Sequence, residues 1–209
     1  MSFLFSSGLR GSAIPDSVIH RYDFEDESDT STLTDIVGSA DGSITGMAYT
    51  TTAAEDSYAG DFDGSDDEVE IQRADDYPIS FTFYVYPQDV GGSGNTWISW
   101  GFNFDDGLGI AIKANSGGLE VLLGNDSPII GGSLSQNTKY HIGVTISDSG
   151  NITAYINGEE VDSASGSSDG VTSTSYIGSE GGENHADVIL DDVEVHDKEL
   201  TQSEVEERM

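Results

Sequence analysis

The sequence predicts an all-β protein, an antiparallel β-sandwich of the jelly-roll type that ends in one short C-terminal helix. Three observations support this fold class. Apolar and polar residues alternate in many short segments, as they do in half-buried strands. Clusters of Gly, Asn, Asp and Ser separate these segments, and 26 glycines suit tight turns better than helical crossovers. The alternation stops only near the C-terminus, where a helix start signal follows.

The strongest predicted strand is ISFTFYVYP (79–87), which is β-branched and aromatic throughout and ends at Pro87. The other predicted strands are IHRYDFE (19–25), DEVEI (67–71), NTWISWGF (95–102), LGIAIKA (108–114), GLEVLLG (118–124) and KYHIGVTIS (139–147). Asn157-Gly158 stands between two alternating segments, which indicates a two-residue hairpin turn. The length fits a single sandwich, and we assign residues 19–209 to one domain.

The C-terminal segment VILDDVEVHDKELTQSEVEE (188–207) combines a strand that carries two adjacent aspartates with a helix start. Thr201 is followed three residues later by Glu204, which is the spacing of a capping box. The last residues therefore predict a short terminal helix.

Acidic residues dominate the charged composition. The chain has 39 Asp and Glu against seven Lys and Arg, a formal charge of −32. This balance argues against binding nucleic acid or an anionic membrane surface, since phosphates require basic side chains. No apolar segment approaches the roughly 20 residues of a membrane span. At about 1 M salt the Debye length is only about 3 Å, so self-repulsion is screened, and we interpret the chain as halophilic.

Residues 1–18 are predicted to form an N-terminal arm outside the sandwich. Phe3, Leu4 and Phe5 form a short apolar patch that lacks the basic and long apolar regions of a secretory signal. We expect this patch to dock onto a larger assembly. A disordered terminus is the alternative.

Several segments in order resemble the laminin-G-like jelly roll of the concanavalin A-like lectin/glucanase superfamily. They are YDFE (22–25), TDIVGSADGSITG (34–46), YAGDFDGSDDEVEI (58–71), ISFTFYVYP (79–87), YHIGVTISDSGNITAYINGEEV (140–161), YIGSEG (176–181) and DDVEVHDKELTQSEVEE (191–207). The resemblance implies that the first and last strands are neighbours in one sheet. It also implies that the short terminal helix covers an edge of the sandwich, where backbone groups would otherwise be unpaired. Tyr22 and Phe24 are then expected to share a core with Val193.

The resemblance also implies one Ca²⁺ ion between the N-terminal loop and the last strand. The matching residues are Asp35, Asp41 and Asp191. Carboxylates beside a Gly-rich turn suit Ca²⁺, which takes six to eight oxygen ligands. The loop departs from the family's D-x-S-G-N pattern, and the alternative is that these aspartates are turn and surface residues.

Catalytic branches of the superfamily carry their carboxylates on one strand as E-x-D-x-x-E. Here Glu68 and Glu70 share a face, but the rest of that pattern is absent, so we expect no enzymatic activity. The four histidines, His20, His141, His185 and His196, show no zinc-binding spacing.

Aromatic residues supply the candidate ligand contacts. Trp97 and Trp100 are three apart on a strand and are expected on opposite faces, with Trp97 the exposed one. Tyr84 and Tyr86 lie on the strand face opposite Phe81 and Phe83. We expect Trp97, Tyr84 and Tyr86 to contact a ligand; for the tyrosines, buried structural side chains are the alternative.

Three functional hypotheses follow. The favoured one is a non-catalytic structural protein of a virion, a capsid decoration, turret or tail component of a halophilic virus, whose lectin-like head binds host-surface glycans. Its expected partners are other virion proteins and copies of itself, with assembly in the host cytoplasm. The second is a cellular or exported module that binds carbohydrate or protein outside the cell or on its surface. The third is a glycoside hydrolase, which the missing carboxylate pattern disfavours.

Overall fold

The computed structural model describes residues 14–92, 94–103, 108–124, 126–166 and 170–209. Its strands are β1 (Val18–Tyr22), β2 (Thr32–Leu33), β3 (Gly42–Thr45), β4 (Ala48–Thr50), β5 (Ala59–Asp63), β6 (Glu68–Ile71), β7 (Ile79–Pro87), β8 (Asn95–Asn103), β9 (Leu108–Asn115), β10 (Gly118–Leu123), β11 (Asp126–Gly131), β12 (Tyr140–Ile146), β13 (Asn151–Ile156), β14 (Glu159–Ser165), β15 (Ser175–Ile177) and β16 (Asp187–His196), and its helix is α1 (Gln202–Glu206). No described helix is long and apolar enough to span a membrane.

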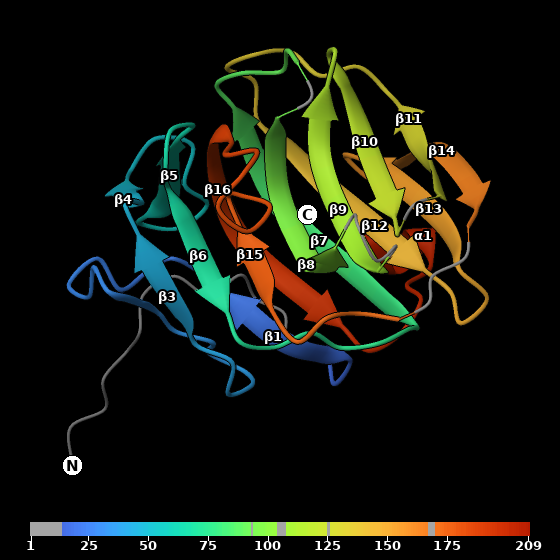
Figure 1. The fold of residues 1–209 in the computed structure, drawn as a ribbon, viewed down its shortest axis with the longest axis horizontal. Helices are drawn as coiled ribbons and strands as arrows, with labels where there is room; N and C mark the ends of the chain where they lie inside the picture. The colour runs from blue at the N-terminus through green and yellow to red at the C-terminus, as the bar shows by residue number, and fades with distance from the viewer. Residues whose placement is uncertain (1–13, 93, 104–107, 125, 167–169) are drawn as a thin grey trace.

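The strands form two antiparallel sheets that lie one behind the other in Figure 1. Sheet 1 has the order β14-β13-β12-β7-β16-β5-β4, with β1 also paired to β16. Sheet 2 has the order β11-β10-β9-β8-β15-β6-β3-β2. This confirms the predicted all-β sandwich with a short C-terminal helix.

Aromatic side chains from both sheets meet in the core. Phe81 and Phe83 of β7 are fully buried and pack edge-on against Trp100 and Trp97 of β8, with ring centroids 5.8 Å and 6.3 Å apart. Edge-on packing is the favoured arrangement of aromatic rings at such distances. These contacts join sheet 1 to sheet 2.

The first and last strands pair as expected. Tyr22 lies opposite Val193 in the antiparallel β1–β16 ladder, and Phe24 is fully buried in the same core. Phe24 has a φ of 55°, and its ring takes the space where a side chain on Gly60 would stand, since a Cβ there would lie 2.6 Å from the ring. Gly60 therefore makes room for the ring that closes this end of the core.

The predicted local signals of the C-terminal half are also confirmed. Asn157 and Gly158 have φ values of 52° and 78° between β13 and β14, as a type I′ hairpin turn requires. The capping box of α1 is present, with the Thr201 side chain accepting from the Glu204 N–H and the Glu204 carboxylate accepting from the Thr201 N–H. The hairpin turn at Asn157-Gly158 and the start of α1 at Thr201 are thus both determined by residues close together in sequence.

Helix α1 lies on the outer face of sheet 1, which differs from the expected position at a sheet edge. Val205 is fully buried with Tyr155 and Leu200, and a Cβ on Gly143 would lie 2.6 Å from the Val205 side chain. Tyr155 and Gly143 are opposite each other on β13 and β12, away from the edge strand β14. The helix packs there because glycine leaves a depression that Val205 fills.

The described chain begins just before the predicted domain start. Val18 is the first residue of β1 and is buried, one position ahead of residue 19. The apolar patch of the arm, Phe3, Leu4 and Phe5, lies outside the described residues.

Candidate functional site

A groove of about 710 Å³ lies on the outer face of sheet 2. Ile112 of β9, Val121 of β10 and Ile177 of β15 point into the core between the sheets. Because side chains alternate along a strand, their neighbours Lys113, Leu122 and Tyr176 point outward, away from sheet 1. Its lining residues are Phe102, Asn103, Lys113, Leu122, Thr172, Thr174, Tyr176, Glu180, Gly181, Glu183 and Asn184. We call these residues the sheet 2 groove. They come from four strands, β8, β9, β10 and β15, and from the loops on either side of β15.

Lys113 lines the sheet 2 groove and is paired with Glu120 of the neighbouring strand. They are opposite each other on β9 and β10, and the Lys113 Nζ lies 3.6 Å from a Glu120 carboxylate oxygen. Both are nearly buried, and Asn115 donates a further hydrogen bond of 3.0 Å to Glu120. Burial of a charged pair is favourable only when both charges are compensated, as they are here.

The loop that follows β15 forms one wall of the sheet 2 groove. A Glu180 carboxylate oxygen accepts hydrogen bonds from the Asn184 amide at 2.7 Å and from the Thr96 hydroxyl at 3.3 Å. The Glu180 N–H donates to the Glu183 carbonyl across the intervening glycines, which closes a turn. The wall is thus held in place by bonds to β8 as well as within the loop.

Tyr176 supplies the aromatic surface of the groove. It lies on β15 opposite Ser99 of β8 and Glu70 of β6, and its side chain is partly exposed. Gly181 rests on its ring, since a Cβ there would lie 3.2 Å from a ring carbon. Burial and the charges of Glu70 and Glu68 raise the pKa of the Tyr176 hydroxyl, so it stays protonated and can donate a hydrogen bond.

This arrangement suits a polar, uncharged ligand with an apolar face. Tyr176 and Phe102 offer rings, while Asn103, Asn184 and the nearby threonines offer hydrogen-bond donors and acceptors. A mostly preformed cleft with few convergent polar groups is typical of a small-molecule or glycan site. The sequence analysis identified none of these residues. The available signal was Lys113 and Glu120, two charged residues in otherwise apolar strands.

Trp97 is not an exposed contact, so that prediction is wrong. Trp97 is 0% and Trp100 1% exposed, and both belong to the core. The register of β8 against β9 shifts between Thr96 and Ile98. Such a bulge inserts an extra residue, so that Trp97 faces inward together with Ile98 and with Trp100.

Tyr84 and Tyr86 lie on the outer face of sheet 1, on the other side of the molecule from the sheet 2 groove. Both are partly buried. The Tyr84 ring packs against His141 with centroids 5.0 Å apart, and the Lys139 Nζ is 5.0 Å from the Tyr84 ring centroid. Tyr84 therefore already has partners within the protein, and its role as a ligand contact stays a prediction.

The twin aspartates of β16 point to different partners. Asp191 accepts hydrogen bonds from the N–H groups of Glu55 at 2.6 Å and of Asp192 at 2.8 Å. Burial and the charge of Asp192 raise the pKa of Asp191 to about 7. Asp192 has a φ of 49° at a register shift of β16 and binds the Arg21 guanidinium of β1 at 2.6 Å. Asp191 therefore holds the loop at Glu55 in place, and Asp192 holds β1 through Arg21.

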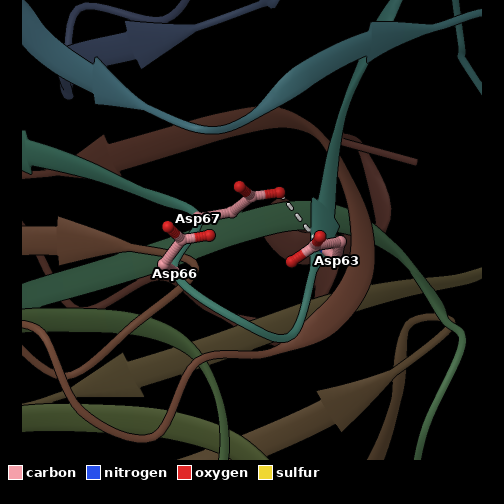
Figure 2. A group of neighbouring side chains, drawn as sticks. All are labelled: Asp63, Asp66 and Asp67. Carbon is pink, nitrogen blue, oxygen red and sulfur yellow. Dashed lines mark hydrogen bonds between the residues drawn. The ribbon is translucent and has the colours of Figure 1, made fainter.

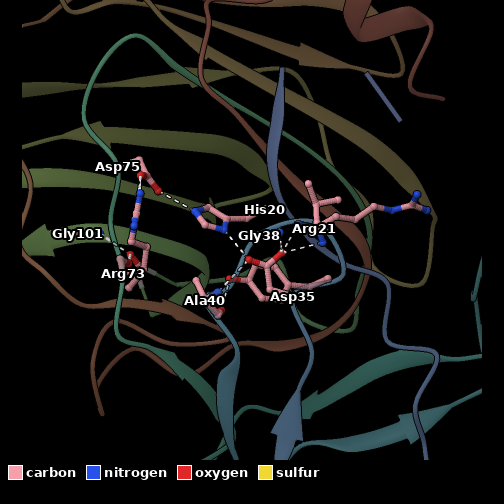
Figure 3. Close-up of polar contacts among 11 residues, drawn as sticks. His20, Arg21, Asp35, Gly38, Ala40, Arg73, Asp75 and Gly101 are labelled. Carbon is pink, nitrogen blue, oxygen red and sulfur yellow. Dashed lines mark hydrogen bonds and ion pairs between the residues drawn. The ribbon is translucent and has the colours of Figure 1, made fainter. Parts of the chain in front are cut away.

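Asp35 sits at the centre of the polar network drawn in Figure 3. Its carboxylate accepts from His20 Nδ1 at 2.6 Å and from the backbone N–H groups of Arg21, Val37, Gly38 and Ala40. Burial raises the pKa of Asp35, but these hydrogen bonds lower it by more, to well below its ordinary value. The Asp35 N–H in turn donates to Asp41 at 2.9 Å.

The predicted ligand set of Asp35, Asp41 and Asp191 is therefore not assembled. Backbone N–H donors surround Asp35, whereas Ca²⁺ needs oxygen lone pairs directed at it. Within the described residues, the group of three acidic or imidazole side chains whose ligand atoms lie within 4.8 Å of one another is Asp63, Asp66 and Asp67.

Figure 2 shows these three residues, which we call the acidic triad, in the turn between β5 and β6. Asp67 is nearly buried and accepts from the Asp63 N–H at 2.9 Å, while the other two are exposed. Burial and the neighbouring carboxylates raise the pKa of Asp67. Bound through one oxygen each, the three carboxylates would supply three of the six to eight oxygens that Ca²⁺ takes, so water would have to complete a shell there.

Glu68 and Glu70 share the outer face of β6 as predicted. A Glu68 carboxylate oxygen accepts from the Ser179 hydroxyl at 2.6 Å and from the Gly182 N–H at 3.0 Å. Glu68 thereby anchors the loop that carries the wall of the sheet 2 groove.

Comparisons with known proteins agree with this fold. A family model described as the concanavalin A-like lectin/glucanases superfamily matches residues 63–206. No curated protein sequence matches the chain. Among solved structures, the botulinum neurotoxin serotype D binding domain is 18% identical with a TM-score of 0.72, and the match covers 92% of this chain and 51% of that one.

Two further structures extend the comparison. The binding domain of Paraclostridial Mosquitocidal Protein 1 is 19% identical with a TM-score of 0.71, over 92% of this chain and 52% of that one. Trypanosoma rangeli sialidase with the inhibitor DANA is 17% identical with a TM-score of 0.69, over 94% of this chain and 33% of that one. The chain thus spans about half of each toxin domain and a third of the sialidase, and these identities show a shared fold.

Proposed function

The chain belongs to the concanavalin A-like lectin/glucanases superfamily, and from this premise we propose that it is a non-catalytic glycan-binding adhesion module whose binding site is the sheet 2 groove. The observation that carries the proposal is the placement of the partly exposed Tyr176 ring beside hydrogen-bonding side chains in a hollow of about 710 Å³. Sugars combine apolar ring faces with hydroxyl groups, and this site offers a partner for each.

Several neighbours of known structure are named as binding domains, which supports adhesion over catalysis. A glycosidase needs two carboxylates about 5–9.5 Å apart across a reachable sugar. Asp191, whose pKa of about 7 would suit an acid catalyst, is 3% exposed beneath Glu55 on the opposite side of the sandwich. Glu68 is engaged by two donors of the adjacent loop.

A pair of tyrosine substitutions tests the binding site. Tyr176→Ala removes the ring of the sheet 2 groove, and Tyr84→Ala removes a ring of similar exposure from the outer face of sheet 1. Truncating a tyrosine at the centre of a site costs about 2 kcal/mol or more, which is about thirtyfold in affinity. On an immobilised glycan panel we expect Tyr176→Ala to lose binding and Tyr84→Ala to retain it. The reverse result would place the site at Tyr84 and Tyr86 instead.

For the biological setting we propose a virion component of a halophilic virus, with the sandwich as its glycan-binding head and the N-terminal arm, residues 1–18, as the docking segment through its Phe3, Leu4 and Phe5. The formal charge of −32 and the apolar Phe3–Phe5 segment support this setting. Proteomic analysis of purified particles, together with deletion of residues 1–13, is the test. We expect the full chain in particles and the shortened chain outside them. An equally incorporated shortened chain would contradict the docking role, and absence from particles would favour a cell-surface or exported module.

A further inference from the structure

We infer that the sheet 2 groove excludes acidic glycans, such as sialylated or sulfated chains, in favour of their uncharged forms. The inference rests on the proposed glycan site and specifies its ligand class. Recognition of an acidic sugar requires a cationic side chain or a cluster of free donors directed at the anion. The structure places the basic residues elsewhere or in existing pairs.

Every described lysine and arginine is already paired with a carboxylate. The pairs are Arg21 with Asp192 and Glu194, Arg73 with Asp75, Lys113 with Glu120, Lys139 with Glu55, Lys198 with Glu204, and Arg208 with Glu194. Of these cations, Lys113 alone lines the sheet 2 groove. An acidic ligand could use Lys113 only by competing with Glu120, whose nearly buried carboxylate lies 3.6 Å from the Lys113 Nζ.

The other charges of the groove are negative. Glu180 and Glu183 belong to its lining, and Glu70 lies beside Tyr176 on the neighbouring strand. The carboxylates of Glu70 and Glu68 also act on the Tyr176 hydroxyl, whose pKa is raised by burial and then by these charges. The groove therefore presents carboxylate oxygens, which accept hydrogen bonds from sugar hydroxyls but repel a carboxylate or sulfate group.

The expected discrimination follows from Coulomb's law. A like charge about 4 Å away in water weakens binding by a factor of about five, which corresponds to about 1 kcal/mol. Two such carboxylates, Glu180 and Glu183, give about twenty-fivefold. Because both are in contact with solvent in an open groove, the discrimination is screened by salt: the Debye length falls from about 10 Å at 0.1 M to about 3 Å at 1 M.

The experiment compares matched glycans by calorimetry with the full chain. Lactose-terminated oligosaccharides are paired with their sialylated and sulfated forms, and glucosamine oligomers with their N-acetylated forms, at 0.1 M and 1 M KCl. We expect the uncharged member of each acidic pair to bind at least twentyfold more tightly at 0.1 M KCl. This ratio should fall to a few-fold at 1 M KCl, while the affinity for the uncharged glycan stays nearly constant.

A charge-removing variant provides the internal test. Glu180→Gln/Glu183→Gln keeps side-chain oxygens that can accept from Thr96 and Asn184, and it should reduce the discrimination at 0.1 M KCl to less than fivefold. The matched control, Glu159→Gln/Glu160→Gln, removes two exposed charges from β14 of sheet 1 and should leave the discrimination unchanged. If the affinity ratio between uncharged and acidic glycans fell equally in both variants, the discrimination would be an effect of net charge, and the inference that the groove carboxylates cause it would be overturned.

The outcomes separate this inference from the proposed function. Equal or tighter binding of the acidic glycans overturns the inference and leaves glycan binding in place, whereas tighter binding of the cationic glucosamine oligomers than of their N-acetylated forms follows from the same carboxylates and supports it. Binding to no glycan of the panel overturns the proposed function, and the inference falls with it.

Discussion

His20 is predicted to act as a positively charged clamp between two segments of the chain. Its Nδ1 lies 2.6 Å from Asp35, its Nε2 lies 2.9 Å from Asp75, and its side chain is 6% exposed (Figure 3). Burial lowers the pKa of His20, but the hydrogen bonds and charges of the two aspartates raise it by more, so the net shift is upward from 6.5. With both ring nitrogens donating, the imidazolium joins β1 to the loops at Asp35 and Asp75.

The perturbation is His20→Asn, which can keep one neutral hydrogen bond and loses the charge. Each hydrogen bond to a charged group contributes about 1.5–3 kcal/mol, and the neutral bond that remains about 1 kcal/mol. The expected loss in the free energy of unfolding is therefore about 3 kcal/mol. For a chain of this size that is about 6–12 °C in melting temperature.

The pH dependence has a definite sign. Because the pKa of His20 is raised in the folded state, its contribution is complete below its ordinary value of 6.5 and is lost as pH rises through the raised value. The pKa values of Asp35 and Asp75 are lowered, so their contribution is present above the ordinary 3.8 and is lost as pH falls through the lowered values. The clamp is fully formed from about pH 4 to 6.5.

Urea unfolding at fixed 2 M KCl, from pH 5 to pH 9, measures this effect while surface charges are screened. The difference between the natural chain and His20→Asn should be about 3 kcal/mol at pH 5–6 and should shrink toward pH 9. The control is His185→Asn, since His185 bonds to a backbone carbonyl of Asp67. A difference that stays constant from pH 5 to pH 9 would refute the charged clamp, because an uncharged imidazole contributes without titrating.

Four further predictions address other contacts. Arg208→Ala should cost about 3–5 kcal/mol in urea unfolding, because it leaves the nearly buried Glu194 carboxylate without its 2.6 Å partner; a loss below 1 kcal/mol would contradict this. Gly143→Ala should lower stability by about 1–3 kcal/mol and expose α1 to proteolysis, since the new methyl group meets Val205. Raising KCl from 0.1 M to 2 M should raise the melting temperature of a chain with a charge of −32, and NaCl should do the same if screening is the cause. Millimolar CaCl₂ should raise the melting temperature more in the natural chain than in Asp66→Asn, which weakens the acidic triad, and equal shifts would exclude the acidic triad as the calcium site.

Local and periodic signals predicted the fold well. The pairing of Tyr22 with Val193 followed from a resemblance to a known fold, and the hairpin at Asn157-Gly158 followed from turn chemistry alone. The capping box at Thr201 likewise needs only four consecutive residues. The turn and the capping box depend on residues that are neighbours in sequence, so the sequence carries these two signals directly.

The orientation of Trp97 and the location of the site depend on long-range contacts instead. A single bulge at Thr96–Ile98 turns Trp97 inward, and nothing in NTWISWGF marks it, because a bulge is fixed by pairing with another strand. The sheet 2 groove joins Lys113 of β9 to Tyr176 of β15, which are brought together only through β8. Alternation predicts which side of a strand a residue faces, but it does not predict which outward-facing residues the sheet order makes neighbours.

Three of the few cations of this acidic chain are held in enclosed ion pairs. Arg21, Lys113 and Arg208 have side chains no more than 17% exposed, and each binds a carboxylate that is still more buried. Salt screens such enclosed pairs much less than it screens exposed carboxylates. Molar salt therefore removes most of the surface repulsion while it preserves the contacts that tie β1 and the C-terminus to β16. Because these structural pairs occupy the cations, the proposed glycan recognition at the sheet 2 groove would rely on ring contacts and neutral hydrogen bonds, which molar salt leaves nearly unchanged.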